Sequence, residues 1–508
     1  MPTGFADGSE RVQLVARGRG GRREAKGEHS GGRKSGVTSI RDDAHSLDSS
    51  EEARSTLDQA FRRSCRLEVP LRQGLPCVSS LTVGTTSHGS GDADWPIGVA
   101  PDLVIYDQSS TRTVHGVSDS LAIVSSPGTT PVTVRVITTT EHAAFIAARS
   151  SASFLQTPGW ARVKPEWRAE SLGWFRGAEL VGAGLVLYRQ LPRVKRFLAY
   201  LPEGPVIDWA DDDLAGWLDP LAAHVKKQGA FGVRMGPPVI TRRWSAAQIK
   251  EGIADDAVRR LTDVPPLERT REGAAVVAQL HELGWRPQAV AGGFAAGQPK
   301  YNFVIALTTS TKGTVTARTE DDVLKGMNQL WRRNIKKAAK EGVVVEQGTR
   351  TDLKSFHDLY VHTAERDHFT ARPLSYFETM YDALDTEASG RITLWLARHE
   401  GDLVASTIGI RVGTHAWYSY GASSTEKREV RGSNAVQWEM IRHAMANGAE
   451  VYDLRGITDT LDADDSHVGL IQFKVGTGGE AVEYVGEWDL PLNKALYKAF
   501  DLYMARRS

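Results

Sequence analysis

The sequence predicts a mixed α/β protein in which one folding unit occurs twice. Segments in which apolar and polar residues alternate, such as TVRVIT (133–138) and RFLAYLP (196–202), are typical of strands. Between them lie segments with a helical period, such as LAGWLDPLAAHVKKQG (214–229). The segment LAAHVKKQGAFGVRMGPP (221–238) then returns as MIRHAMANGAEVYDLRG (440–456). A spacing of about 220 residues is too long for a solenoid and indicates duplication of a whole domain.

Two further pairs of segments support the duplication. GAELVGAGLVLYR (177–189) is similar to EGDLVASTIGIRV (400–412), and KRFLAYLPEGPV (195–206) is similar to HAWYSYGASS (415–424). In each half the predicted order is a hairpin, a helix, a Gly-Ala pair and a buried strand. The same order of elements in both halves favours duplication of a whole domain over chance similarity between single segments.

The chain divides by composition into four parts. Its N-terminal region contains Ser/Thr/Gly-rich stretches such as SSLTVGTTSHGSGDAD (79–94), which cannot bury enough apolar surface to offset chain entropy. The C-terminal segment NKALYKAFDLYMARR (493–507) is an amphipathic helix that we expect to pack back on the first domain. The predicted parts are a disordered extension (1–130), a first domain (131–297), a second domain (298–490) and the C-terminal helix (491–508).

The composition excludes several classes of protein. The 62 basic residues balance the 62 acidic ones, so a nucleic acid or an anionic membrane would have to be bound by a local patch. No signal architecture or membrane-spanning run is evident, and Cys65 and Cys77 both lie in the N-terminal extension. These features predict a cytoplasmic protein without disulfides or cysteine-based zinc sites.

The segment TEDDVLKGMNQLWRRNIKKAAKEG (319–342) predicts a single helix with a capping box of Thr319 and Asp322. Its basic residues Arg332, Lys336 and Lys340 recur every four positions and form a stripe. The stripe fits either a solvated helix face or an anion-binding surface.

The motifs of several common enzyme classes are absent. The sequence contains no HExxH, no Cys/His ligand spacing, no GxSxG elbow and no GxxxxGK[ST] fingerprint. The glycines of GTGGE follow Lys474, whereas a phosphate-binding P-loop requires them before its lysine. Hydrolase, kinase and dehydrogenase interpretations therefore lack their characteristic residues, and we expect no metal or cofactor.

Seven segments are distinctive in combination: FLQTPGWARVK (154–164), RRNIKKAAKEGV (332–343), RPLSYF (372–377), WYSYGAS (417–423), NAVQWEMIRHAM (434–445), YDLRG (452–456) and GLIQFKVGTGG (469–479). In this order the chain resembles the Fem (FemABX) family of aminoacyl-tRNA-dependent peptidyltransferases. The resemblance runs from about residue 135 to residue 505.

The resemblance implies a fold, a reaction and two partners. The fold is two tandem GNAT-like domains, here without the coiled-coil arm that some members insert after the segment matching RRNIKKAAKEG. The reaction is transfer of an amino acid from aminoacyl-tRNA, the donor, to the stem-peptide amine of a peptidoglycan precursor, the acceptor. With such a donor, the stripe of Arg332, Lys336 and Lys340 is a candidate surface for binding tRNA. We expect a monomer in the cytoplasm, at the inner face of the membrane if the acceptor is lipid-linked and not nucleotide-linked.

The resemblance also assigns the acyl-transfer centre to Phe473 and Lys474. The run HVGLIQFKVG (467–476) is apolar and strand-like, so we expect a strand that delivers Lys474 into a glycine-lined gap. A cation there can stabilise the oxyanion of an ester aminolysis, and Phe473 would shape the pocket. The alternative is a surface lysine before a turn.

Four residues match the family's precursor site: Lys164, Arg372, Tyr376 and Tyr420. Cationic donors suit a diphosphate, and a guanidinium can bind two of its oxygens at once. The alternatives are an exposed Arg372 before a helix and a core position for Tyr420.

Other functions and one departure from the family stay open. In a CoA-binding loop, KREVRGSNAVQWEM (427–440) would carry Glu429 and Asn434 at positions unsuited to a pyrophosphate, which disfavours an acyl-CoA N-acyltransferase. Gly236 stands where many members have Asp, so the proton acceptor is unassigned. A tRNA-dependent enzyme that acts on a small-molecule peptide, and an inactive binding or regulatory relative, also remain, and the transferred amino acid is not named by the sequence.

Overall fold

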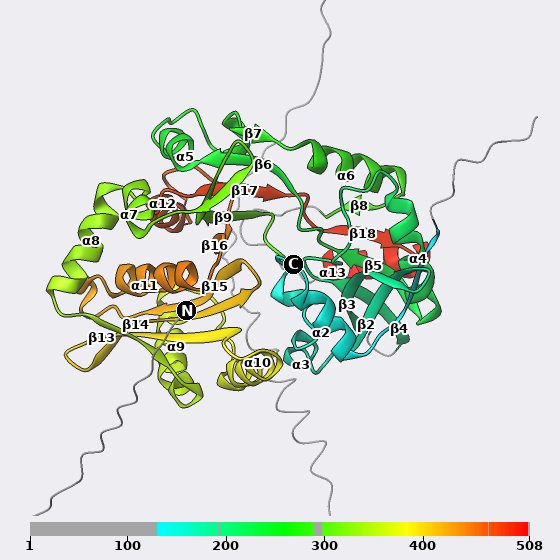
Figure 1. Cartoon of the computed structure of the whole chain (residues 1–508), viewed down its shortest axis with the longest axis horizontal. Coiled ribbons are helices and arrows are strands. Elements are labelled where there is room, and N and C mark those ends of the chain that lie inside the picture. The colour runs from blue at the N-terminus through cyan, green and yellow to red at the C-terminus, as the bar shows by residue number, and fades with distance from the viewer. Residues whose placement is uncertain (1–129, 192–193, 289–296, 466, 506–508) are drawn as a thin grey trace, which may run out of the picture. The chain divides into compact units, whose positions relative to one another are not determined.

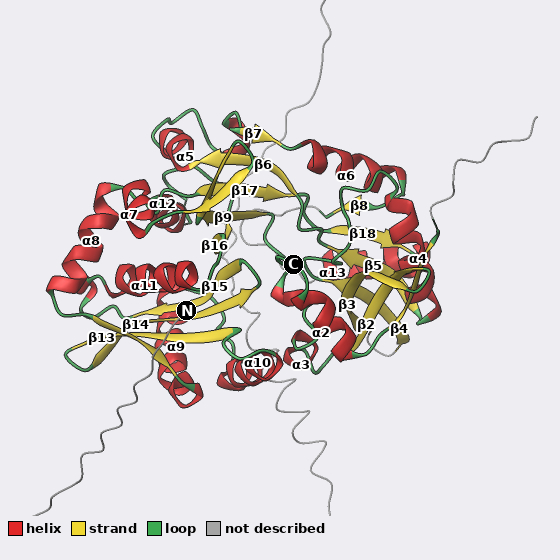
Figure 2. Cartoon of the chain, in the orientation of Figure 1, coloured by secondary structure: helices red, strands yellow, loops and turns green. Residues whose placement is uncertain are grey.

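The computed structural model describes residues 130–191, 194–288, 297–465 and 467–505. The predicted N-terminal extension lies outside the described residues, except for its last position. All described residues belong to one compact unit. They form two large mixed sheets with helices packed against them (Figures 1 and 2).

The first sheet is built mainly from the first half of the sequence. Its strands run β1-β2-β3-β4-β5-β18-β8 across the sheet. Helix α4 (Leu214–Lys227) packs against β1 and β5. The strands of this sheet are β1 (Val132–Val136), β2 (Arg168–Arg176), β3 (Glu179–Leu191), β4 (Val194–Leu201), β5 (Ala230–Met235), β18 (Trp488–Pro491) and β8 (Arg286–Pro287).

The second sheet has the order β12-β13-β14-β15-β16-β9-β17-β6-β7. Helix α11 (Gly432–Ala446) packs against β13 and β14, and α9 (Leu353–Asp367) packs against β14 and β15 (Figure 1). The strands are β12 (Val344–Gly348), β13 (Ile392–His399), β14 (Asp402–Val412), β15 (His415–Ser423), β16 (Val451–Ile457), β9 (Tyr301–Ala306), β17 (Glu480–Tyr484), β6 (Ile240–Ser245) and β7 (Glu268–Arg269).

The remaining elements connect these strands. A separate hairpin is formed by β10 (Thr308–Thr311) and β11 (Thr314–Ala317). The other helices are α2 (Thr139–Ala147), α3 (Trp160–Val163), α5 (Ala246–Ile253), α6 (Arg271–Glu282), α7 (Glu320–Gly326), α8 (Gln329–Lys340), α10 (Leu374–Glu387), α12 (Val468–Val475) and α13 (Lys494–Ala505). Single 3₁₀ turns lie at η1 (Phe154–Gln156), η2 (Leu261–Asp263), η3 (Arg350–Asp352) and η4 (Arg428–Val430).

The duplication predicted from the sequence is confirmed. In the first half, β2, β3 and β4 pair antiparallel, and β4 then pairs parallel with β5 after the crossover helix α4. In the second half, β13, β14 and β15 pair antiparallel, and β15 pairs parallel with β16 after α11. The parallel pair of each half is joined through a helix, as parallel strands require.

The division between the sheets does not follow the expected boundary between residues 297 and 298. Strand β6 from the first half pairs with β17, and β18 from the end of the chain pairs with β5 (Figure 1). Glu483 on β17 fastens the first exchange, since its carboxylate binds Arg242 and lies 3.0 Å from Nζ of Lys300. Each half therefore completes the sheet of the other.

The segment 319–342 forms two helices, so the prediction of one continuous helix was wrong. The capping box of Thr319 and Asp322 is present and starts α7. The backbone then leaves the helix at Met327, and the side chain of Asn328 accepts a hydrogen bond from the amide of Trp331 to start α8. Asn is a strong N-terminal cap, and this one restarts the helix two residues after α7 ends. After α8 the chain reaches β12 without a coiled-coil arm.

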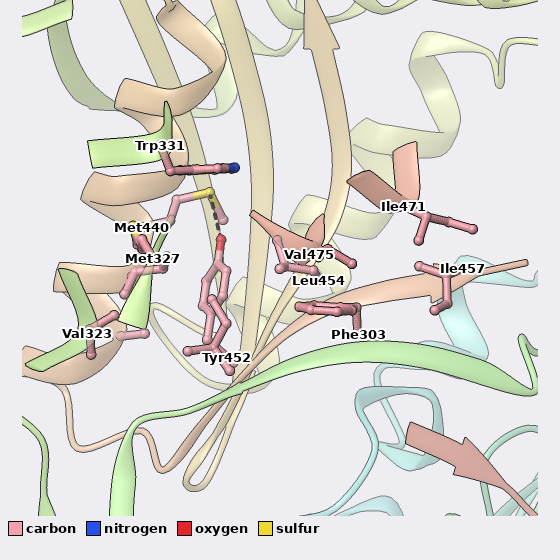
Figure 3. Packing of buried hydrophobic residues seen from close by; sticks show 14 of the residues in the cluster. Phe303, Val323, Met327, Trp331, Met440, Tyr452, Leu454, Ile457, Ile471 and Val475 are labelled. Atoms are coloured by element: carbon pink, nitrogen blue, oxygen red, sulfur yellow. Dashed lines mark hydrogen bonds between the residues drawn. The ribbon is translucent and has the colours of Figure 1, made fainter. Parts of the chain in front are cut away.

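Apolar residues of both α7 and α8 join a large core of the second sheet. Val323, Met327 and Trp331 lie near Met440 and Tyr452 in this core (Figure 3). On another side of the same core, Ile471 and Val475 of α12 pack near Phe303, Leu454 and Ile457 (Figure 3). This core anchors α12, which carries Lys474.

The C-terminal helix α13 packs against the first sheet. Tyr497 and Phe500 of α13 are buried against Phe231 on β5 and Leu198 on β4. The hydroxyl of Tyr497 donates a hydrogen bond to the carboxylate of Asp489 on β18.

Candidate functional site

Lys474 lies on helix α12 and not on a strand, which corrects the sequence-based expectation. Val468, Ile471 and Val475 are buried at helical spacing, while Leu470 is exposed. The apolar residues of this segment therefore lie on different faces of the helix, some toward the core and Leu470 toward the surface. The same residues read as a strand because their run is short and almost wholly apolar.

The amine of Lys474 is held by backbone carbonyls of β16. Its side chain is buried, with the residue 3% exposed, and Nζ donates to the carbonyl oxygens of Gly456 at 2.7 Å and Arg455 at 3.3 Å. Arg455 has a left-handed backbone with φ of 62°, where the pairing of β16 with β9 shifts register. Asp453 supports this bulge, because its Oδ1 accepts a 2.6 Å hydrogen bond from the amide of Arg455.

Burial lowers the pKa of Lys474 to about 7, and the negative charge of Asp453 opposes that shift. A lysine with a pKa near neutrality changes its charge within the physiological pH range. Its two carbonyl partners leave a third N–H of the ammonium form for a reacting group.

Lys474 shares a cavity with two of the predicted precursor-site residues. This cavity, of about 850 Å³, will be called the lysine cavity. Arg372 and Tyr420 line it together with Lys474, and Leu470 of α12 contributes to the same wall. Further residues of the lining are Tyr360, Tyr418, Ser419, Lys300 and Asp459.

All four predicted precursor-site residues line a second cavity of about 410 Å³, the tyrosine cavity. The hydroxyls of Tyr376 and Tyr420 lie 3.1 Å apart, and Nζ of Lys164 lies 5.2 Å from the ring centroid of Tyr376. The guanidinium of Arg372 lies 4.6 Å from the same ring. The two cations are therefore gathered at one tyrosine, and Arg372 and Tyr420 line both cavities.

The environment of Lys164 and Tyr376 is partly desolvated. Burial lowers the pKa of Lys164, and the nearby charge of Arg372 lowers it further. Burial also raises the pKa of Tyr376 well above its usual value, so its hydroxyl stays a neutral donor and acceptor. Because the charge of Arg372 disfavours the charged form of Lys164, an anion bound beside both cations would stabilise them.

Phe473 lines a different cavity from Lys474, so the expectation that it shapes the lysine pocket was wrong. Successive residues of a helix point about 100° apart, and Phe473 faces Trp331, with ring centroids 4.8 Å apart. Its backbone carbonyl also accepts a 2.9 Å hydrogen bond from the indole of Trp331. Gly469, Gln472 and Phe473 line this cavity of about 390 Å³, which will be called the α11 cavity.

The α11 cavity lies at the N-terminus of a long helix and is bordered by cations. Gly432, Ser433 and Asn434 open α11, and Lys427, Arg428 and Arg431 precede them in the lining. Lys427 is paired with Glu400 and Asp402. A helix N-terminus with basic neighbours is a common binding place for phosphate. Sequence reasoning examined this loop only as a CoA loop and did not name its three cations.

The carboxylate expected to obstruct that loop is not part of the cavity. Glu429 is exposed on η4 and does not contribute to the lining, whereas Asn434 does. The carbonyl oxygen of the Asn434 side chain accepts a 3.3 Å hydrogen bond from Asn334 on α8. Because Glu429 does not line the cavity, its charge is not a reason to exclude a pyrophosphate there.

The basic stripe on α8 does not line the α11 cavity. The guanidinium of Arg332 donates to carbonyl oxygens at the end of α7, those of Lys325 and Met327. Lys336 and Lys340 are exposed. Leu330, Trp331 and Asn334 are the residues of α8 that line the cavity. Arg332 therefore caps the end of α7. Of the three residues of the predicted stripe, Lys336 and Lys340 are the exposed ones.

A fourth cavity, of about 270 Å³, lies beside Gly236 and will be called the carboxylate cavity. A side chain at position 236 would begin 3.5 Å from Cγ of Glu487. Glu203, Asp453 and Arg455 also line the cavity. Carboxylates are therefore present around Gly236, although Gly236 itself provides none. Sequence reasoning missed them, because no motif connects Glu203 and Glu487 over such a distance along the chain.

The described residues contain no group of three or more His, Cys, Asp or Glu side chains that could hold a metal ion. None of the helices within the described ranges is both long and apolar enough to cross a membrane.

Comparison with known proteins agrees with the resemblance found in the sequence. The family model described as the FemAB family matches residues 137–394 and 393–504. The chain belongs to the FemAB family. Curated relatives of this FemAB protein include the lipid II:glycine glycyltransferases of Staphylococcus aureus strains MRSA252 and USA300. Each is 24% identical over 432 residues, an alignment that covers 72% of this chain and 94% of the relative.

Solved structures include a similar FemAB-type fold. The crystal structure of FemX aligns with a TM-score of 0.60 and 24% identity, covering 72% of this chain and 99% of FemX. The predicted fold class, α/β with two tandem GNAT-like domains, is confirmed.

Proposed function

We propose that this FemAB protein is an aminoacyltransferase that moves an amino acid from aminoacyl-tRNA to the stem-peptide amine of a peptidoglycan precursor. Family membership and the relatives named lipid II:glycine glycyltransferase support the acceptor class. The observation that carries the proposal is the position of α12. Lys474 on this helix lines the lysine cavity, and the adjacent Phe473 lines the α11 cavity.

The lysine and tyrosine cavities suit the acceptor. Lys164 and Arg372 at the ring of Tyr376 supply the charge-assisted donors that a diphosphate needs. The shared lining of the two cavities would let a precursor extend from this cluster toward Lys474. A precursor has a diphosphate that can bind at this cluster and a peptide that can reach Lys474.

The α11 cavity suits the donor. Backbone amides at the start of α11 and the side chains of Arg428 and Arg431 favour a phosphate. Phe473 offers an aromatic ring of the kind on which nucleic acid bases stack. These are requirements of an RNA 3′ end that carries an ester-linked amino acid.

The reaction between the two cavities is aminolysis of an ester. The acceptor amine, in its neutral form after the ammonium has lost one proton, forms a C–N bond to the aminoacyl carbonyl. The ester C–O bond breaks, and one further proton of the nitrogen ends on the departing ribose oxygen. The carbonyl oxygen carries negative charge on the way. The ammonium form of Lys474, fixed by the carbonyls of Arg455 and Gly456, stabilises that charge without reorganising.

A transfer assay tests this function. Purified protein is incubated with a mixed pool of charged tRNA and with a lipid-linked or nucleotide-linked precursor, and the product is weighed by mass spectrometry. The expected product is heavier by one amino acid residue and requires charged tRNA. Acetyl-CoA serves as the competing donor and a free peptide without diphosphate as the competing acceptor. Acetyl transfer without tRNA, or equal use of the free peptide, would contradict the proposal.

A further inference from the structure

The carboxylate cavity and the tyrosine cavity adjoin but carry opposite charges. Gln298, Pro299, Arg455 and Glu487 line both of them. Among the described residues, the tyrosine cavity is lined by one carboxylate, Glu487, and by several cations: Lys164, Arg189, Arg234, Arg372 and Arg455. The described lining of the carboxylate cavity contains three carboxylates, Glu203, Asp453 and Glu487, and one guanidinium, that of Arg455. A ligand that spans them would need a negative end and a positive end.

Two of the three carboxylates are already engaged by neighbouring groups. Glu203 accepts a 2.8 Å bond from Arg455 and a 2.6 Å bond from the hydroxyl of Ser153. Asp453 holds the amide of Arg455 and lies 3.3 Å from Nδ2 of Asn302. These two carboxylates and one guanidinium form a compact cluster that neutralises only part of the negative charge.

Glu487 is the carboxylate without a cationic hydrogen-bond partner among the described contacts. Its Oε1 accepts a 2.6 Å bond from the neutral hydroxyl of Tyr200. The nearby Arg234 is occupied by Asp489, with two bonds of 2.7 Å. Burial raises the pKa of Glu487, while Tyr200 and Arg234 lower it. A cation beside this carboxylate would offset the cost of its burial.

A second observation points to a hydrogen-bond donor in the same cavity. Asn302 is 2% exposed and lines the cavity, yet its Oδ1 has no hydrogen-bond partner among the described residues. His415 also lines the cavity, and its Nε2 lies 3.4 Å from the carboxylate of Asp453. Buried carbonyl oxygens are almost always bonded, so a ligand here should donate.

We propose that the carboxylate cavity binds the side-chain ammonium group of the acceptor, with Glu487 as its ion-pair partner and Asn302 as a further hydrogen-bond acceptor. An ammonium group has three N–H donors and no acceptor, which fits a lining of carboxylates and an unpaired amide oxygen. The diphosphate end of the same molecule then lies in the adjoining tyrosine cavity. The proposal rests on the proposed function and names a specificity determinant for it: Glu487 selects stem peptides that carry an amine.

The test is binding of two diphosphate-linked stem peptides that differ only in one residue, which is lysine in one and norleucine in the other. Calorimetry with the wild-type protein should give at least a tenfold tighter dissociation constant for the lysine peptide, because a charge-assisted pair is lost with norleucine. Glu487→Gln keeps the hydrogen bond to Tyr200 but removes the charge, so it should bind the two peptides equally. Glu282→Gln, an exposed position on α6, is the matched control and should keep the preference.

Each outcome decides a different point. Equal binding of both peptides by the wild-type protein would overturn the ammonium site and leave the proposed function intact. Retention of the preference by Glu487→Gln would overturn the role of Glu487. Failure of both peptides to bind would remove the proposed acceptor and this proposal with it.

A second variant keeps the proposal testable if Glu487→Gln does not fold. Gly236→Leu adds a side chain whose Cβ meets its neighbours at ordinary contact distances, the nearest at 3.5 Å, and which then extends into the cavity. This variant changes no charge. It should lower the affinity for the lysine peptide about tenfold, to that of the norleucine peptide. Unchanged preference for the lysine peptide would contradict the proposed position of the ammonium group.

Discussion

At the scale of single residues, the geometry around Tyr376 distinguishes two otherwise similar cations. Arg372 lines both the lysine and the tyrosine cavities, whereas Lys164 lines only the tyrosine cavity. Under the proposed function, Arg372 would contact the precursor where it turns from one cavity into the other. Its planar guanidinium can bind two phosphate oxygens, which an ammonium cannot do in the same way.

Arg372→Lys tests this role. The change keeps the positive charge but removes bidentate binding, so the Michaelis constant for the precursor should rise about tenfold while that for charged tRNA stays constant. Steady-state kinetics with each substrate varied in turn measures both constants. A rise in the tRNA constant alone would place Arg372 on the donor side.

How much of the site could be predicted differs from residue to residue. Lys474, Lys164, Arg372, Tyr376 and Tyr420 lie in short motifs, and the structure brings them to two adjoining cavities. Their roles stay predictions. Glu203 and Glu487 belong to none of the seven motifs. They line the same cavity because β18, which follows Glu487, pairs with β5. Local sequence carries no signal for such a contact.

At the scale of elements, the errors have physical causes. The α12 segment was predicted as a strand because a short apolar run fits a buried strand and a buried helix equally well. The break between α7 and α8 was missed because capping signals identified the outer ends, whereas the inner cap Asn328 sits within a helix-favouring sequence.

The cations before α11 and those on α8 should differ in their effect on the donor. Arg428 and Arg431 line the α11 cavity, so neutralising both should raise the Michaelis constant for tRNA. The slope of this constant against salt concentration, on logarithmic axes, should become shallower by the amount expected for about two phosphate contacts. Lys336 and Lys340 are the exposed remainder of the stripe. Neutralising them should change the Michaelis constant for tRNA and its salt dependence much less. Kinetics at several salt concentrations compares the two double variants. A larger effect from the α8 pair would restore the original expectation for the stripe.

The C-terminal helix should contribute strongly to stability through one side chain. Phe500 is 7% exposed against Phe231, so Phe500→Ala should lower the free energy of unfolding by about 3–5 kcal/mol. Leu502, on the same helix, is 54% exposed, and Leu502→Ala should change it by less than about 0.5 kcal/mol. Urea unfolding of both variants measures the difference. Equal effects would show that α13 does not depend on this face for packing.

At the scale of the whole molecule, the duplication was visible in the sequence but the interdependence of its halves was not. The repeats correspond to equivalent strands of the two sheets, since alternation and helical period are local properties. The pairing of β6 with β17 and of β18 with β5 is non-local. No pattern within either segment specifies its distant partner.

This interdependence leads to a prediction about fragments. A chain of residues 130–508 should fold and keep its turnover, because it holds every described element. A fragment of residues 131–297 should not fold, because it lacks β18 between β5 and β8 and leaves β6 without β17. Circular dichroism and urea unfolding test both. A cooperative unfolding transition of the short fragment would restore the boundary at residue 297.

The central claim is that Lys474 acts as a cation on the developing oxyanion. Lys474→Met removes the charge and keeps much of the apolar stem, so acceptor affinity should survive while turnover falls about 10²–10³-fold. The pKa near 7 adds a condition on pH. Below that pKa the lysine is charged and effective, and above it the ammonium is lost.

The most direct measurement is therefore the ratio of wild-type to Lys474→Met kcat as a function of pH. The profile of Lys474→Met alone reports the protonation of the bound acceptor amine, and the ratio isolates the contribution of Lys474. The ratio should be about 10²–10³ below pH 7 and should fall toward unity as the pH rises through and beyond the pKa of Lys474. A ratio near one at every pH, or one that increases with pH as expected for a neutral amine acting as a base, would contradict the assignment.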